Sequence, residues 1–200
     1  MLDSTKNITN KIQDNYLRFE QYFTKIDVAK ESIKLILNDL KTIKKIDVFG
    51  TNQLHFIEPS CGEGVFIKEL KRINENIKIT GIDIDSIYQQ AIVFNFLDAD
   101  KNVLNIKEDE ITVFFGCPPS YLTKEFIQHC ETITKNSITY FLLEENQLRE
   151  CIKSKLIVFS KILKNFGHNA FLLRNIDYTT QGAYLLTRII FTPDRQNDFS

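Results

Sequence analysis

Residues 54–70 predict a buried strand, a tight glycine turn and the start of a helix, in that order. The segment 54–58 is mostly apolar and has strand length, and the apolar residues at 65–70 have helical spacing. Gly62 and Gly64 lack a Cβ atom, so the chain can turn sharply there and a ligand can approach its backbone. The free N–H groups and positive dipole end of the helix would face this turn. This geometry binds the polar part of a nucleotide-like cofactor, although Gly-x-Gly alone fits a plain tight turn equally well.

Two further apolar segments end at positions suited to binding. Residues 78–83 form a predicted strand ending in Asp83, where a doubly wound α/β sheet places a carboxylate beside the cofactor ribose. Residues 111–116 form another predicted strand, and the two prolines after it exclude a helix directly behind it. This strand therefore presents a rigid loop at the sheet edge where such folds bind ligands. The loop consists of Cys117, Pro118, Pro119, Ser120 and Tyr121.

Hydrophobic periodicity extends this layout to one α/β domain. Apolar residues between Val28 and Leu40 recur on one helical face. Predicted strands lie near 54–58, 78–83, 92–95, 111–116 and 138–143. Predicted helices lie near 64–74, 85–91, 122–134 and 146–165, although the run at 156–159 fits a strand equally well. The segments 169–173 and 183–191 predict a final antiparallel pair of strands.

The order of these motifs resembles the S-adenosylmethionine-dependent methyltransferases. It is most similar to the branch that methylates the exocyclic amine of adenine in DNA or RNA. The matching segments are Glu-Pro-Ser-Cys-Gly-Glu-Gly at 58–64, Gly-Ile-Asp-Ile-Asp at 81–85 and Gly-Cys-Pro-Pro at 116–119. The segment 20–24 resembles the part of that branch that packs over the methionine end of the cofactor. Asn95-Phe96 stands where the family has Asp-Phe beside the adenine.

This resemblance implies a Rossmann-like fold with a seven-stranded methyltransferase sheet and helices on both faces. The expected strand order is 3-2-1-4-5-7-6. Residues 1–18 would be a polar N-terminal segment and residues 19–195 a methyltransferase-like domain. The implied cofactor is S-adenosylmethionine. The implied cofactor-binding residues are Tyr22, Phe23, Thr24, Glu58, Pro59, Cys61, Gly62, Gly64, Asp83, Ile84, Asn95 and Phe96.

The proline loop departs from the pattern of that branch. The family has Asn or Asp, then two prolines, then Tyr or Phe; the first side chain orients the target amine and the aromatic ring stacks on the flipped base. Here Cys117 replaces the amide, and a thiol is a weak acceptor. Ser120 replaces the aromatic residue, and Tyr121 comes one position late. Residues 117–121 are therefore a candidate catalytic loop whose motif is degenerate.

Several interpretations remain open at this point. The chain is either a non-catalytic subunit that positions an active partner, or an active methyltransferase on RNA, DNA or another amine. A nucleophilic role for Cys117 is disfavoured, because the cysteine of cytosine methyltransferases follows its proline and no histidine is close in sequence. A nicotinamide-binding domain is also disfavoured, because Ile67 stands at the position of the third glycine.

Composition limits the partners and the compartment. The net charge of −1 gives no general attraction to phosphate, so any nucleic-acid substrate would need a protein partner for much of its binding. No apolar run is long enough for a membrane span, and we expect no membrane association. Four widely spaced cysteines favour reduced thiols in the cytoplasm or the nucleus. The three histidines form no cluster, so no metal site is expected.

Overall fold

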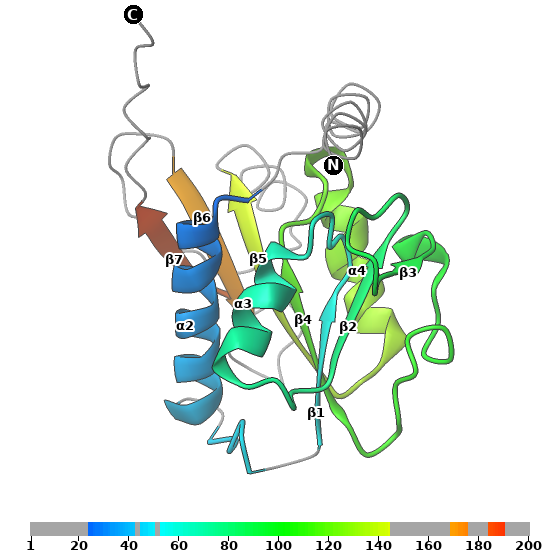
Figure 1. Cartoon of the computed structure of the whole chain (residues 1–200), viewed down its shortest axis with the longest axis horizontal. Helices are drawn as coiled ribbons and strands as arrows, with labels where there is room; N and C mark the ends of the chain where they lie inside the picture. The colour runs from blue at the N-terminus through cyan, green and yellow to red at the C-terminus, as the bar shows by residue number, and fades with distance from the viewer. Residues whose placement is uncertain (1–23, 43–44, 51–52, 145–168, 176–183, 191–200) are drawn as a thin grey trace, which may run out of the picture.

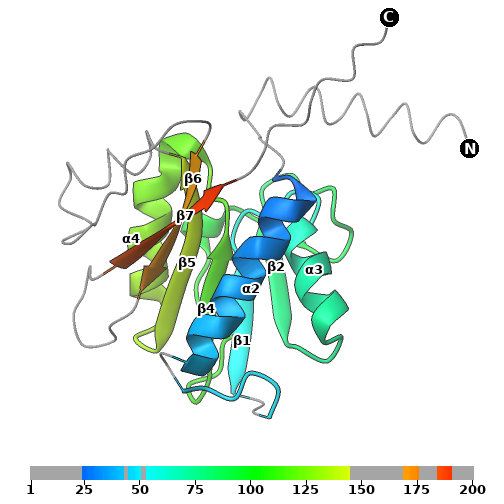
Figure 2. The same ribbon diagram turned by 90° about the vertical axis from the view of Figure 1, so that its left-hand side faces the viewer.

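The computed structural model shows a single sheet with helices on both faces (Figures 1 and 2). The ranges that the structure describes are 24–42, 45–50, 53–144, 169–175 and 184–190. The predictions for residues 1–18, Tyr22, Phe23 and the helix at 146–165 lie outside these ranges.

Five parallel strands lie side by side in the order β3-β2-β1-β4-β5, which confirms the predicted α/β class. They are β1 (Leu54–Glu58), β2 (Ile79–Asp83), β3 (Ile92–Val93), β4 (Ile111–Gly116) and β5 (Ser137–Glu144). The described helices beside them are α2 (Ile26–Thr42), α3 (Val65–Ile73) and α4 (Thr123–Ile133). Two short 3₁₀ turns are η1 (Phe96–Asp98) and η2 (Ser120–Leu122).

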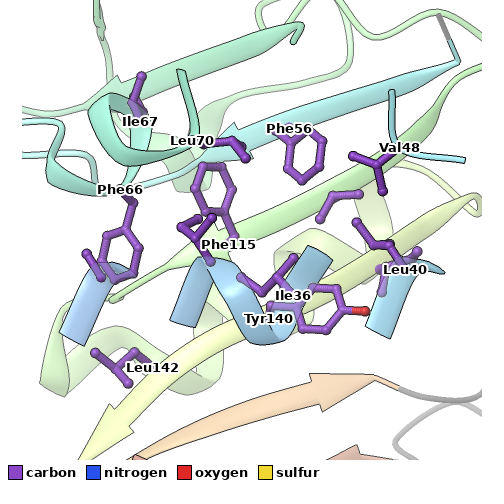
Figure 3. Close-up of a cluster of buried hydrophobic side chains, with 14 of the residues drawn as sticks. Ile36, Leu40, Val48, Phe56, Phe66, Ile67, Leu70, Phe115, Tyr140 and Leu142 are labelled. Carbon is purple, nitrogen blue, oxygen red and sulfur yellow. The ribbon is translucent and has the colours of Figure 1, made fainter. Parts of the chain in front are cut away.

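Alternate side chains of the central strands build two cores, one on each face of the sheet. On the face covered by α2 and α3, Phe56 of β1 and Phe66 of α3 both pack edge-on against Phe115 of β4, with ring centroids 5.8 and 6.3 Å away (Figure 3). On the opposite face, Ile57 and Phe114 pack with residues of α4. Both faces of β1 and β4 are therefore buried, which explains why these two strands are mostly apolar runs.

The predicted order of the last strands is wrong. The antiparallel pair forms as β6 (Asn169–Asn175) and β7 (Tyr184–Ile190), but β6 pairs with β5 and β7 lies beyond it. The order is therefore 5-6-7 at this edge instead of 5-7-6. A hairpin of two apolar strands can join a sheet through either strand. Hydrophobic periodicity does not distinguish the two choices, because it fixes only the face of each side chain.

The predicted helix at 85–91 is also wrong, because this segment forms turns in the structure. Its backbone donors bond to the glycine turn: the N–H groups of Ile87 and Tyr88 both donate to the Gly62 carbonyl, at 3.2 and 3.0 Å. The Ser86 hydroxyl lies 3.0 Å from the Gly62 carbonyl and accepts from the Tyr88 N–H. These contacts replace the hydrogen bonds that a helix would need and hold the segment against the carboxyl end of β1.

No helix in the described part of the chain is both long and apolar enough to cross a bilayer.

Candidate functional site

A cavity of about 500 Å³ lies where β1, β2 and β4 end. Ligands of open α/β sheets bind at this edge, and the volume is in the range of small-molecule sites. The predicted residues that line it are Thr24, Glu58, Pro59, Cys61, Gly62, Asp83, Ile84, Asn95, Phe96, Cys117, Pro118, Pro119, Ser120 and Tyr121. The same cavity is thus lined by predicted cofactor-binding residues and by the whole candidate catalytic loop, residues 117–121.

The glycine turn between β1 and α3 forms one side of the cavity. Gly64 is the residue before α3 and adopts φ +70°, a left-handed conformation that side chains rarely take. A Cβ atom added there would lie 2.8 Å from Cγ of Tyr88. Gly64 is not itself part of the cavity wall. Its role is to let the chain enter the helix while the 86–88 segment packs against the turn.

Asp83, at the end of β2, is held by backbone donors from both sides. Its Oδ2 accepts from the Gly62 N–H at 2.8 Å, and its Oδ1 accepts from the Asp85 N–H at 3.0 Å. The carboxylate lines the cavity with 6% of the residue exposed. Two carboxylate oxygens offer about four acceptor sites, so two donors leave acceptor capacity for a ligand. Asp83 can therefore accept hydrogen bonds from hydroxyl groups while it keeps those from the Gly62 and Asp85 N–H groups.

Glu58, at the end of β1, is a buried acid that faces the cavity. It is 2% exposed, and its Oε2 atom has no hydrogen-bond partner. Burial raises the pKa of Glu58 well above the usual value for a glutamate, against the lowering effect of a hydrogen bond from the Ile67 N–H. The negative charge of Asp83 raises it further. A buried acid with an unpaired oxygen fits a ligand that brings a donor or a positive charge.

Cys61 is a packing residue within the wall. It is buried, and its sulfur lies 3.5 Å from the Ser86 hydroxyl. Burial raises the pKa of the Cys61 thiol to about 12. The thiol is therefore neutral at physiological pH and unsuited to nucleophilic attack.

Asn95 and Phe96 close the side of the cavity near η1. The Asn95 side chain accepts from the Leu97 N–H at 3.2 Å and so caps the turn. The Phe96 ring packs against Phe126 and edge-on against His129, with both centroids 5.0 Å away. Phe96 is therefore held by the core behind it, and its placement beside the cavity does not depend on a ligand.

The candidate catalytic loop forms the remaining wall. Cys117 is half-buried, and its carbonyl accepts a hydrogen bond of 2.9 Å from the Ser60 hydroxyl. The Thr123 hydroxyl lies 3.1 Å from the Pro119 carbonyl and 3.2 Å from that of Ser120. Tyr121 lines the cavity although it comes one position after the expected aromatic site, and it is 58% exposed. The backbone of the loop is thus held by hydrogen bonds from the Ser60 and Thr123 hydroxyls, while its side chains at 117 and 120 differ from the pattern of the adenine branch.

Several wall residues were not predicted from the sequence. They are Ile26, Ser60, Glu63, Val65, Phe66, Lys68, Leu122 and Phe126. Most of them are sequence neighbours of the predicted motifs, so proximity to the glycine turn and the proline loop was the available signal. Tyr22 and Phe23 lie outside the described residues.

The histidine of β1 belongs to a separate cluster at the other end of the strand. The His55 ring lies 2.8 Å from the Thr80 hydroxyl and 3.4 Å from a Glu110 oxygen, and Lys78 pairs with the same carboxylate at 2.6 Å. Burial, followed by the positive charge of Lys78, lowers the pKa of His55 to about 4. This cluster lies at the amino-terminal edge of the sheet, away from the cavity wall. No group of three or more metal-ligating side chains occurs among the described residues.

Comparison with known proteins gives one distant similarity. No family model matches the chain. It is 20% identical over 132 residues to the Type II methyltransferase M.CvrRI of Paramecium bursaria Chlorella virus XZ-6E. The aligned region covers 62% of this chain and 33% of that protein, so the chain matches about a third of its relative's length. With the α/β fold and the cavity at its sheet edge, this similarity supports a methyltransferase-like protein.

Proposed function

We propose that this chain binds S-adenosylmethionine in the cavity at the ends of β1, β2 and β4. The observation that carries the proposal is the wall itself, where two buried carboxylates and a glycine turn meet the proline loop. Asp83 would accept the ribose hydroxyls, and Asn95 with Phe96 would lie beside the adenine. The unpaired Oε2 of Glu58 suits the amino group of the methionine end, whose positive charge would favour the ionised form of this acid. The cofactor would supply an electrophilic methyl group on its sulfonium.

Isothermal titration calorimetry with S-adenosylmethionine tests this proposal directly. We expect saturable binding by the wild-type chain and weaker binding by Asp83→Ala. Each hydrogen bond to a charged acceptor is worth about 1.5 to 3 kcal/mol, and two would be lost. The matched control is Asp109→Ala, an exposed carboxylate away from the cavity wall. Absence of heat at millimolar cofactor would contradict the proposal.

We further propose that the isolated chain has little adenine methylation activity and works as a subunit of a complex. Cys117 offers only a weak acceptor to an amine, and Ser120 offers no ring to a flipped base. Removing one preorganised polar contact of this kind costs about 10² to 10³ in rate. A protein partner would supply the missing contacts and the attraction to nucleic acid that a net charge of −1 does not provide.

Radiolabelled methyl transfer to DNA, RNA and peptide pools tests the subunit proposal. The assay compares the purified chain with the chain recovered together with its native partners. We expect activity only in the second sample. Robust turnover by the purified chain would overturn the proposal of a non-catalytic subunit.

The alternative is an active methyltransferase that uses the altered loop, and the position of Tyr121 favours it. This ring lines the cavity and is more than half exposed, so it is accessible for stacking on a planar substrate. If the chain is active, Tyr121→Ala should abolish turnover while Tyr121→Phe retains it. In an active chain, Cys117→Asn and Ser120→Tyr then report the substrate. A gain in adenine methylation identifies a weakened adenine site, and a loss identifies a different acceptor.

A further inference from the structure

The candidate catalytic loop is fixed at its two ends by the fold. Before the loop, Gly116 is the last residue of β4 and pairs with Phe141 of β5. After it, the Thr123 hydroxyl bonds to the Pro119 carbonyl, and the Leu122 N–H donates to the same carbonyl at 3.1 Å. The two prolines have little freedom in φ. The orientation of the loop is therefore decided mainly at Gly116 and Cys117.

Gly116, where β4 ends and the loop begins, has no Cβ atom to restrict the backbone. Its φ of +119° lies in a region that side chains rarely adopt, and a Cβ atom there would approach Cγ of Glu58 to 3.0 Å. The absence of a Cβ lets Glu58 pack against the β4 end. It also removes one steric limit on rotation of the peptide that follows. Another group must then help to hold the Cys117–Pro118 peptide.

Ser60 supplies such a hold from the glycine turn. Its hydroxyl donates to the Cys117 carbonyl at 2.9 Å, across 57 residues of sequence. The carbonyl belongs to the peptide that joins Cys117 to Pro118, so this bond restrains the plane of that peptide and the backbone torsion ψ of Cys117. The turn that carries Ser60 is itself held to the β2 end, through the Cys61 N–H to the Ile82 carbonyl and the Gly62 N–H to Asp83.

We propose that Ser60 is a positioning residue that fixes the Cys117–Pro118 peptide and thereby places the catalytic loop relative to the cofactor turn. The inference deepens the proposed function, because it names the contact that joins the two halves of the cavity.

Alkylation of Cys117 in the full-length chain tests this inference. Iodoacetamide is the probe, and peptide-resolved mass spectrometry reads the rate at each cysteine separately. Cys130 in α4 is 0% exposed, so it is the internal control for global loosening, whereas Cys117 is half-buried. The variants are Ser60→Ala, which removes the hydroxyl, and Ser60→Thr, which keeps it. All rates are measured without cofactor.

We expect Ser60→Ala to alkylate at Cys117 about fivefold faster than wild type, the factor that corresponds to losing one ordinary hydrogen bond. Ser60→Thr should stay within about twofold of wild type, because one hydrogen bond is retained. Equal rates in wild type and Ser60→Ala would overturn the inference. So would a parallel rise at Cys130, which would mean general destabilisation, or an equal rise in Ser60→Thr, which would mean a packing effect.

Calorimetry of the wild-type chain with S-adenosylmethionine is run separately and judges only the proposed cofactor. If the wild-type chain fails to bind it, the proposed function fails. The alkylation rates still decide the role of Ser60, because they do not require a ligand.

Discussion

Replacing Asp83 with Asn should destabilise the free protein as well as the cofactor complex. The Asp83 carboxylate accepts the Gly62 N–H at 2.8 Å and the Asp85 N–H at 3.0 Å. An asparagine has one acceptor oxygen and one NH₂ group, so one of these two donors would face another donor. An unpaired buried donor costs about 1 to 3 kcal/mol; because Gly62 and Asp85 are half-buried, we expect the lower part of that range, about 1 to 2 kcal/mol.

Urea denaturation followed by circular dichroism measures this loss in the free energy of unfolding. Asp109→Asn is the matched control, since it removes the same charge from an exposed turn and should stay within about 0.5 kcal/mol of wild type. Repeating the titration with S-adenosylmethionine separates the two roles of Asp83, because a ligand that binds the native state raises its stability by mass action. The wild-type midpoint should rise with cofactor and the Asp83→Asn midpoint should rise less. Equal stability of Asp83→Asn and Asp109→Asn without cofactor would refute the reasoning from the two backbone donors.

Three other changes have defined outcomes. Burial raises the pKa of Glu58, so above the usual glutamate value of about 4.5 the native state keeps a proton that the unfolded state loses. In urea titrations, the free energy of unfolding of wild type relative to Glu58→Gln should therefore fall as pH rises above about 4.5. Burial and Lys78 lower the pKa of His55 to about 4, so the stability of wild type relative to His55→Gln should fall as pH drops from about 6.5 towards 4. Gly64→Ala should lower the free energy of unfolding by about 2 to 4 kcal/mol, because of backbone strain and overlap with the Tyr88 ring. A double variant that also carries Tyr88→Ala should recover part of this loss, and strictly additive effects of the two changes would contradict the overlap.

The strands and the cavity wall were predictable because they depend on local patterns. A buried parallel strand is a short apolar run, and the runs at β1 and β4 were placed with their observed bounds. Glycines, prolines and an acidic residue directly after such strands fall at one edge of the sheet. This geometric rule brings Gly62, Asp83 and Pro118 into one wall without any knowledge of the intervening chain.

The features that the sequence did not predict correctly have a different origin, because they depend on contacts between distant segments. A helix was predicted at residues 85–91, but the N–H groups of Ile87 and Tyr88 donate to the Gly62 carbonyl instead. The order of β6 and β7 depends on which strand of the antiparallel pair forms hydrogen bonds with β5. Ser60 was not singled out, because its partner, the Cys117 carbonyl, is a backbone group 57 residues away. Sequence patterns report faces and turns, and they carry little information on such pairings.

The two halves of the cavity depend on different kinds of interaction, and this explains how one can be altered while the other stays intact. The proposed cofactor half is built from backbone donors, glycines and two buried carboxyl groups, so its shape is part of the fold. In the loop, the prolines and the hydroxyls of Ser60 and Thr123 hold the backbone, while the proposed acceptor contacts would depend on the side chains at 117 and 120. Changing those two side chains alters what the loop can accept without removing any hydrogen bond described for its backbone. Under the proposed function, such a chain would hold a methyl donor in an ordered cavity, while the acceptor contacts would come from a partner or from a different substrate.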